Sequence, residues 1–172
     1  MGLDITAYSR MTKVEVELDE EGDPVNQDIY YTHARVYAAG FRGQHDDLED
    51  GAFYAYEDEF GFRAGSYSGY SAWRGQLAKF AGYPKLRATD GHTAACWEGA
   101  EGPFAELIDF SDCEGSIGPA TSAKLARDFA EHEERARTFD AGPDDEGWFF
   151  RKYQEWKQAF EFAADGGMVA FH

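Results

Sequence analysis

The chain has 172 residues, of which 33 are Asp or Glu and 16 are Lys or Arg, so its formal net charge is -17 at pH 7. So strong a negative charge repels the phosphates of nucleic acids and membrane lipids, and it attracts basic surfaces. Aromatic residues make up 16% of the chain, which is enough apolar area for a core and argues against acidic disorder. We therefore expect one folded domain over residues 1–172 that contacts neither nucleic acid nor membrane directly.

The charge is unevenly distributed along the chain. Most of the acids fall in four segments without any Lys or Arg: residues 15–28, 46–59, 98–114 and 140–146. An opposite stretch, residues 60–89, holds five bases and no acid. The acidic segments are candidates for binding a basic partner, and the basic stretch is the one place where an anion would be favoured.

The first third of the chain has the patterns of β-strands. Apolar and polar residues alternate over residues 3–8 and 13–18, which predicts two half-buried strands. Residues 29–37 are rich in aromatic and β-branched side chains and predict a third strand. Two aromatic pieces, residues 53–56 and 60–63, are expected to form strands around an acidic turn.

Helical periodicity begins near the middle of the chain. Residues 70–80 place apolar side chains on one helical face, with Ser68 or Ser71 as the expected cap and Gly82 as the expected end. A short helix is expected over residues 104–110, followed by a loop over residues 110–119.

Two longer helices are predicted in the C-terminal part, each with one apolar stripe. The stripes are Leu125, Phe129, His132, Ala136 and Phe139, and Phe149, Tyr153, Trp156, Phe160 and Ala163. Residues 168–171 are expected to form a final strand. Strands that precede helices predict an α+β fold, in which an antiparallel sheet from the N-terminal half packs against the C-terminal helices.

The clearest candidate for ligand binding is a Gly/Ser-rich loop that leads into the predicted helix near residue 70. Free backbone N–H groups at a helix start attract anions, and two arginines can hold a phosphate together. The predicted anion site consists of Arg63, Ser66, Tyr67, Ser68, Tyr70, Trp73 and Arg74. In the structural alternative, the glycines form a turn, a serine caps the helix and the aromatic side chains belong to the core.

The second candidate is an acidic surface for a basic partner protein. Its predicted contact residues are Asp46, Asp47, Glu49 and Asp50, in a segment without Lys or Arg. Carboxylates presented in this way can replace phosphates and steer association with a basic protein. The simpler alternative is that the charge only keeps the protein in solution.

Thiol and metal chemistry are weaker candidates. Cys113 precedes a predicted helix, but Asp112 and Glu114 flank it and oppose thiolate formation; His132 is the histidine considered as its base. The spacing of His92, Cys96 and Cys113 matches no usual zinc site. We therefore predict no catalytic residue, no metal and no cofactor. Whether the chain is an enzyme is left open, and the sequence favours a protein without enzymatic activity.

Four blocks of sequence resemble small acidic proteins found in bacteriophages and prophages. The blocks are residues 1–9 (MGLDITAYS), 62–74, 110–119 and the final 171–172. The resemblance implies a viral or mobile-element origin but no particular activity. By association, it favours an inhibitor of host defence or a mimic of nucleic acid.

The sequence thus supports two functional hypotheses from different classes. The first is a cytoplasmic phage or prophage protein that binds a basic protein surface, as an inhibitor or nucleic-acid mimic. The alternative is a nucleotide- or anion-binding protein, with or without enzymatic activity, that uses the loop and helix between Arg63 and Arg74. The cytoplasmic location is expected because the N-terminus has neither the basic nor the apolar region of a signal peptide. The oligomeric state is left open.

Overall fold

The computed structural model describes residues 2–38, 44–83, 101–110, 113–142 and 145–172. All statements below on contacts, burial and exposure concern these residues.

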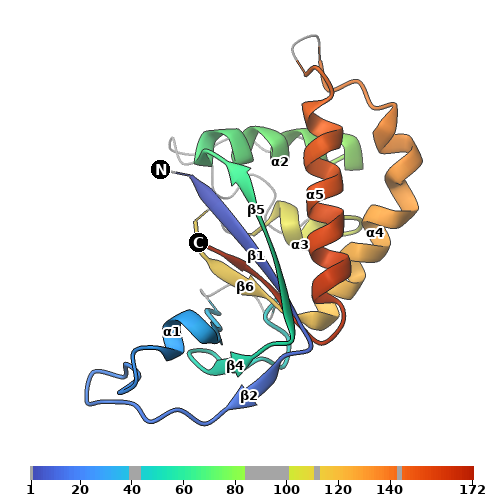
Figure 1. The fold of residues 1–172 in the computed structure, drawn as a ribbon. Helices are drawn as coiled ribbons and strands as arrows, with labels where there is room; N and C mark the ends of the chain where they lie inside the picture. The colour runs from blue at the N-terminus through green and yellow to red at the C-terminus, as the bar shows by residue number, and fades with distance from the viewer. Residues whose placement is uncertain (1, 39–43, 84–100, 111–112, 143–144) are drawn as a thin grey trace.

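A four-stranded antiparallel sheet forms the centre of the molecule, in the order β5-β1-β7-β6. The strands are β1 (Leu3–Ser9), β5 (Asp58–Gly65), β6 (Gly115–Ile117) and β7 (Met168–Phe171). Residues from both ends of the chain therefore pair side by side in the middle of the sheet (Figure 1). Every second residue of β1 is buried, as the alternation in the sequence predicts.

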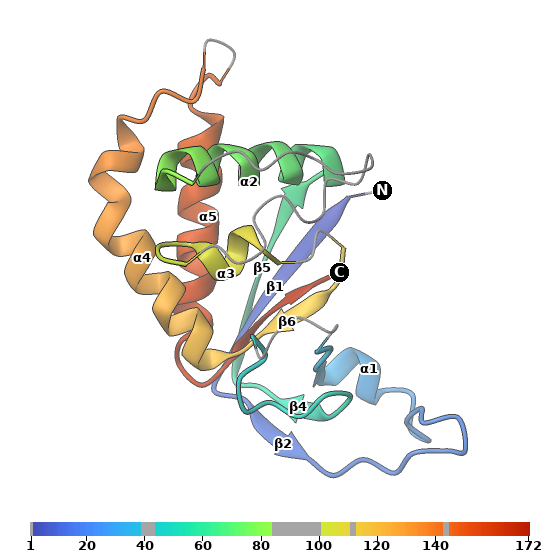
Figure 2. The same cartoon turned by 180° about the vertical axis from the view of Figure 1, so that it is seen from behind.

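Three long helices lie together beside the sheet: α2 (Tyr67–Ala81), α4 (Pro119–Arg137) and α5 (Trp148–Ala163). The short α3 (Ala105–Ile108) packs against α2 and α4 and can be seen in the view from behind (Figure 2). The predicted α+β arrangement, an antiparallel sheet packed against C-terminal helices, is confirmed.

A smaller sheet forms a second layer at the lower end of the molecule (Figure 1). Its order is β2-β4-β3, from β2 (Thr12–Val14), β3 (Ala34–Arg35) and β4 (Phe53–Ala55). The prediction of one strand over residues 29–37 is wrong, because the chain first forms the short helix α1 (Ile29–Thr32). The local β-propensity is overridden there, since only two residues of the segment find a partner strand.

Two further differences concern the middle of the chain. The expected loop at residues 110–119 contains the strand β6. Its three residues, Gly-Ser-Ile, do not by themselves predict a strand. The side chain that caps α2 is Ser66, whose hydroxyl accepts the amide of Gly69 at 3.0 Å, rather than Ser68 or Ser71. Gly82 ends the helix in the left-handed conformation, as predicted.

The core is built largely from aromatic rings. Trp156 on α5 contacts Trp73 of α2, with 5.7 Å between ring centroids, and Phe62 of β5, with 5.1 Å. One turn further along α5, Phe160 stacks on Phe129 of α4 at 5.9 Å. The predicted stripe of α5 is fully buried, and in the stripe of α4 only His132 and Phe139 stay half-exposed.

Shortening the side chain of either Phe129 on α4 or Phe160 on α5 should strongly destabilise the protein. Phe129 and Phe160 both have 0% exposure, so replacing one with Ala removes apolar contacts and leaves a cavity. We expect Phe129→Ala or Phe160→Ala to lower the free energy of unfolding by about 3–5 kcal/mol, measured by urea denaturation. Tyr31→Ala is the control, because Tyr31 is 84% exposed and its loss should be nearly neutral. Wild-type stability of both Phe variants would contradict this packing.

Candidate functional site

The loop that the sequence identifies as an anion site is the capped start of α2. The Ser66 hydroxyl accepts the Gly69 amide at 3.0 Å and lies 3.1 Å from the Ser68 hydroxyl. The amide of Tyr70 already donates to the Ser66 carbonyl at 2.8 Å. The first turn of the helix thus satisfies part of its own N–H groups, which leaves fewer of them for an anion.

The aromatic residues of this candidate site belong mostly to the core. Tyr70 and Trp73 have 0% and 1% exposure. Both rings contact the ring of Trp156, at 5.5 and 5.7 Å. Tyr67 is half-buried at the edge of the same cluster. These rings hold α2 against α5, as the structural alternative expects, and are not open for stacking on a base.

The two arginines lie in different environments. Arg63 is exposed on β5 and pairs with Asp4 at 3.3 Å. Arg74 has 1% exposure, donates to the backbone carbonyl of Phe110 and lies 5.3 Å from the centre of the Tyr70 ring. One guanidinium is therefore in water and the other in the core, so they do not face a common ligand. The expected two-arginine clamp is not assembled by these side chains.

Asp46, the first of the four predicted acidic contacts, has a structural role. One carboxylate oxygen accepts the amide of Thr121 at 2.8 Å, and the other accepts the Thr121 hydroxyl at 2.9 Å. Thr121 lies in the first turn of α4, where amides lack partners within the helix. The N-cap residue, Gly118, has no side chain to supply this cap. Asp46 takes its place from a distant loop, a role that sequence spacing cannot reveal.

The other three predicted contacts differ among themselves. Asp50 accepts the amide of Ala38 at 2.8 Å, and Glu49 pairs with Lys13 at 2.6 Å. Asp47 is exposed and has no hydrogen bond or ion pair within the described part of the chain. The four residues therefore do not form one free acidic face, and Asp47 is the member best placed to meet a partner.

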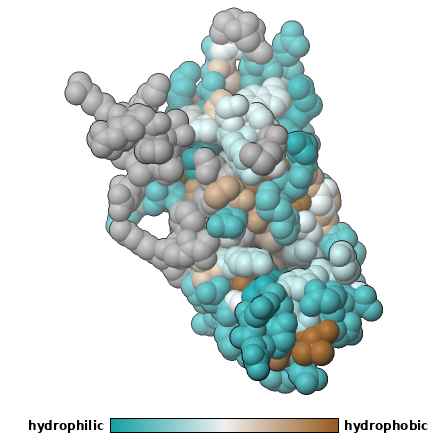
Figure 3. Space-filling view, turned by 90° about the vertical axis from the view of Figure 1, so that its left-hand side faces the viewer, coloured by the Kyte–Doolittle hydropathy of each residue, from teal (hydrophilic) through white to brown (hydrophobic). Residues whose placement is uncertain are grey.

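A stronger candidate surface is the segment of residues 15–37, here called the arm. It contains seven acids and a single Arg or Lys, which is Arg35 near its end. All large hydrophobic residues that are exposed among the described residues also lie in the arm. They are Leu18 (50%), Val25 (58%), Tyr30 (37%), Tyr31 (84%) and Tyr37 (48%). Figure 3 shows a compact apolar patch within hydrophilic surroundings at this lower end of the molecule.

The tip of the arm is held by its own backbone and side chains. Asp19 accepts the amides of Glu21 and Asp23 with one carboxylate oxygen, at 2.9 and 3.0 Å. Leu18 and Pro24 form a β-bridge, and the Val25 amide donates to the Glu17 carbonyl at 2.9 Å. The run of acids at the tip of the arm is therefore a turn, in which an aspartate side chain satisfies the backbone.

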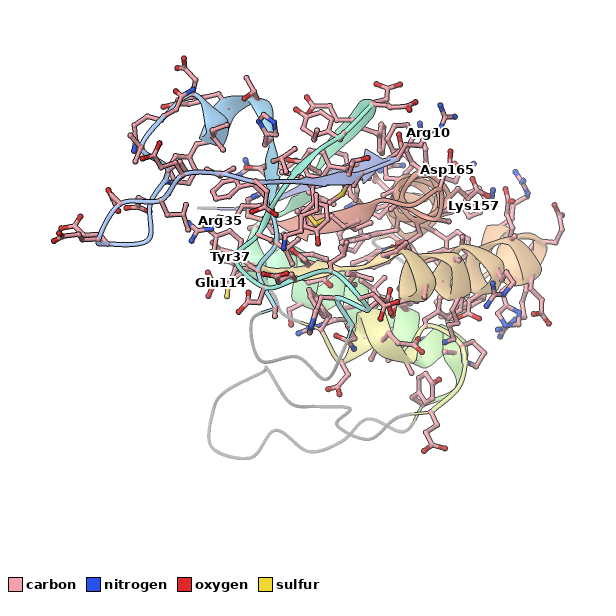
Figure 4. The ribbon with its side chains drawn as sticks, turned by 90° about the horizontal axis from the view of Figure 1, so that it is seen from below. Arg10, Arg35, Tyr37, Glu114, Lys157 and Asp165 are labelled. Carbon is pink, nitrogen blue, oxygen red and sulfur yellow. The ribbon has the colours of Figure 1, made fainter. Side chains whose placement is uncertain are left out.

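Arg35 fastens the arm to the small sheet. Its guanidinium lies 5.3 Å from the ring centres of both Tyr37 and Phe53 and 6.0 Å from that of Tyr30. The Tyr30 hydroxyl donates to Asp23 at 2.5 Å, and this hydrogen bond is the main cause of the raised pKa of Tyr30. Arg35, Tyr37 and Glu114 lie on the same side of the molecule (Figure 4). A cation among aromatic rings is attracted to their faces, so the base of the arm is fixed.

Nothing in the described residues supports thiol or metal chemistry. Cys113 is exposed, and His132 packs its ring against Phe80 and Phe104 with centroid separations of 6.3 and 5.7 Å. His92 and Cys96 lie outside the described residues. Among the described residues, no group of three or more His, Cys, Asp or Glu could hold a metal ion.

Comparisons with known proteins assign no family to the chain. No protein-family model, curated protein or solved structure matches it. Within the described ranges, no helix combines the length and apolar character needed to cross a lipid bilayer. Function must therefore be argued from the surfaces of the molecule itself.

The roles of Asp46 and Asp47 can be separated by a matched pair of substitutions. Asp46→Ala removes both hydrogen bonds to Thr121, so it should destabilise the protein by about 0.5–2 kcal/mol, as loss of a helix cap does. Asp47→Ala should change stability by less than about 0.5 kcal/mol, because the residue is exposed. Urea denaturation of the two variants measures the difference. Equal stability of the two would refute the capping role.

Proposed function

We propose that this chain is a cytoplasmic, protein-binding domain of bacteriophage or prophage type. Its arm docks on the basic surface of another protein and blocks it, with carboxylates in the positions that nucleic-acid phosphates would occupy. The observation that carries the proposal is the coincidence of exposed apolar residues with a nearly base-free acidic segment in the arm.

Both components of the arm are needed for a docking surface. Carboxylates speed the encounter with a basic protein and exclude acidic partners, but exposed charge alone gives little affinity. Affinity in protein interfaces comes mainly from a few buried anchors, in which Tyr, Trp and Arg are enriched. Tyr31 and Val25 are the most exposed apolar residues of the arm. In the sequence, Asp23 and Asp28 flank Val25, and Asp28 precedes Tyr31 by three residues.

The arm is also ordered before it meets a partner. The turn around Asp19 and the ring cluster around Arg35 fix its tip and its base. Ordering a segment upon binding costs free energy, so a surface that is already arranged binds more tightly for the same contacts. This organisation supports docking over the alternative in which the charge only prevents aggregation.

The test is a pull-down from bacterial lysate with tagged protein, at about 0.05 and 0.5 M salt, followed by affinity measurement with the purified partner. Two arm variants separate the contributions: Val25→Ser/Tyr31→Ser removes apolar anchors, and Glu20→Gln/Glu21→Gln removes two charges. The control Glu131→Gln/Glu134→Gln removes the same charge from exposed positions on α4.

We expect the apolar variant to lose at least about tenfold in affinity, as hot-spot residues do. The arm charge variant should mainly slow association, and high salt should have the same effect because it screens exposed charge within about 10 Å. The α4 control should bind like the wild type. A partner that binds all four proteins equally, or independently of salt, would show that the arm is not the docking surface.

A further inference from the structure

A second site lies away from the arm, where the end of β1 meets the C-terminal end of α5. A surface cavity of about 380 Å³ is present there, and its walls carry four carboxylates, from Glu57, Asp58, Glu161 and Asp165. Arg10 and Asp165 lie together beside α5, on the side of the molecule opposite Arg35 and Tyr37 (Figure 4). Neither sequence pattern nor the proposed function of the arm accounts for this cavity.

The positive charges at the cavity do not balance the negative ones. Arg10 pairs with both Glu57 and Asp165, each at 2.7 Å. Glu161 pairs with Lys157 at 2.6 Å, and Lys157 also lies 3.7 Å from Glu133. Within the described residues Asp58 has no ion pair, and α5 has no basic residue in its last turn. Two bases thus face four carboxylates and the negative end of a helix, which favours further cations.

The backbone of the cavity is fixed by close contacts. Arg10 is a non-glycine residue with a φ of 48°, and its amide donates to the Asp165 carbonyl at 2.7 Å. A Cβ added to Gly167 would lie 1.7 Å from the Tyr8 carbonyl oxygen. The chain therefore needs glycine there to bring the turn after α5 against the end of β1. The backbone that carries Asp165 is therefore held close to the end of β1.

Ser9 supplies an independent sign that a ligand belongs in the cavity. It is only 7% exposed and lies on the face of β1 that buries Leu3 and Ile5. Ser9 lines the cavity, its hydroxyl makes no hydrogen bond with the described residues, and this hydroxyl is not among the buried polar atoms that are wholly shut off from solvent. Buried hydroxyl groups normally have a partner, and here the open direction is the cavity.

The arrangement of the carboxylates favours an extended cation over a metal ion. A metal such as Ca²⁺ or Mg²⁺ needs several oxygens at 2.0–2.6 Å around one point. In the described part of the chain no such group of three carboxylates exists. Phe162 adds an apolar wall beside the carboxylates, which suits a chain of methylene groups.

We propose that this cavity binds an aliphatic diammonium ion of the polyamine class. The two ammonium groups satisfy the uncompensated carboxylates, with Ser9 as a hydrogen-bond acceptor for one of them, and the carbon chain lies against Phe162. A lysine side chain carries the same alkylammonium group. Probes that differ in length and in number of charges therefore distinguish a free diammonium ion from a lysine side chain as the preferred ligand.

Isothermal titration and amide NMR shifts can test the site with the full chain. The probes are 1,4-diaminobutane, n-butylamine, a Lys-Ala dipeptide amide and Mg²⁺, at equal ionic strength. The variants are Asp58→Asn, Ser9→Ala and Arg10→Gln, with Glu20→Gln in the arm as a control of equal charge. Each variant is first checked for a melting curve like that of the wild type.

The diamine should bind about tenfold more tightly than butylamine or the dipeptide amide, because it meets two carboxylates. Shifts should be confined to residues 9–10, 57–58 and 161–165. Asp58→Asn should weaken binding about tenfold, whereas Arg10→Gln should strengthen it, since it frees Glu57 and Asp165; Glu20→Gln should have no effect.

Three outcomes would overturn the proposal. Equal weakening by Glu20→Gln would mean that the diamine only joins the counterion cloud of an acidic protein. Tighter binding of Mg²⁺ at the same residues would make the site a metal site. Tighter binding of the dipeptide amide would assign it to lysine side chains. Glu20→Gln serves here only as a charge control, and the cavity contains no residue of the arm, so the proposed function can stand or fall separately.

Discussion

The contacts of Trp156 join the layers of this fold. Its ring lies 5.5 Å from Tyr70 on α2 and 5.5 Å from Phe171 on β7, measured between centroids. Helix and sheet faces can be buried only against each other, and one residue of α5 reaches both. Arg74 lies in the same core next to Tyr70 and makes no ion pair with the described residues. A charge in that position is tolerated because a carbonyl and a ring face replace part of its hydration.

The buried aromatic core around Trp156 allows the surface of the protein to be unusually acidic. Like charges repel one another in the compact state, so a chain with a net charge of -17 needs compensating apolar burial. The main core lies between the large sheet and its helices, and the acidic residues 15–28 lie outside it. A smaller buried cluster joins Ala34 and Val36, at the base of the arm, to Tyr54, Met168 and Ala170. The arm is thus free to carry carboxylates and exposed apolar residues together, because few contacts of the main core depend on it.

The sequence predicted the elements whose side chains repeat with a regular period. The stripes of α2 and α5 were correctly assigned because each buries one continuous face. Residues 29–37 were assigned wrongly, since β-propensity there competes with a short helix and has little partner strand to pair with. β6 is visible only through its pairing with β7, which comes from more than 50 residues later in the chain.

The environments of the charged and apolar residues in the candidate sites are harder to predict for a related reason. Asp46 and Arg74 look like free charges in the sequence, yet each is committed to a contact with a residue far along the chain. Conversely, Val25 and Tyr31 are apolar, yet their side chains are 58% and 84% exposed. Local composition reports how much charge and apolar area a segment has. Only the tertiary contacts decide which of those groups are used internally and which remain available to a partner.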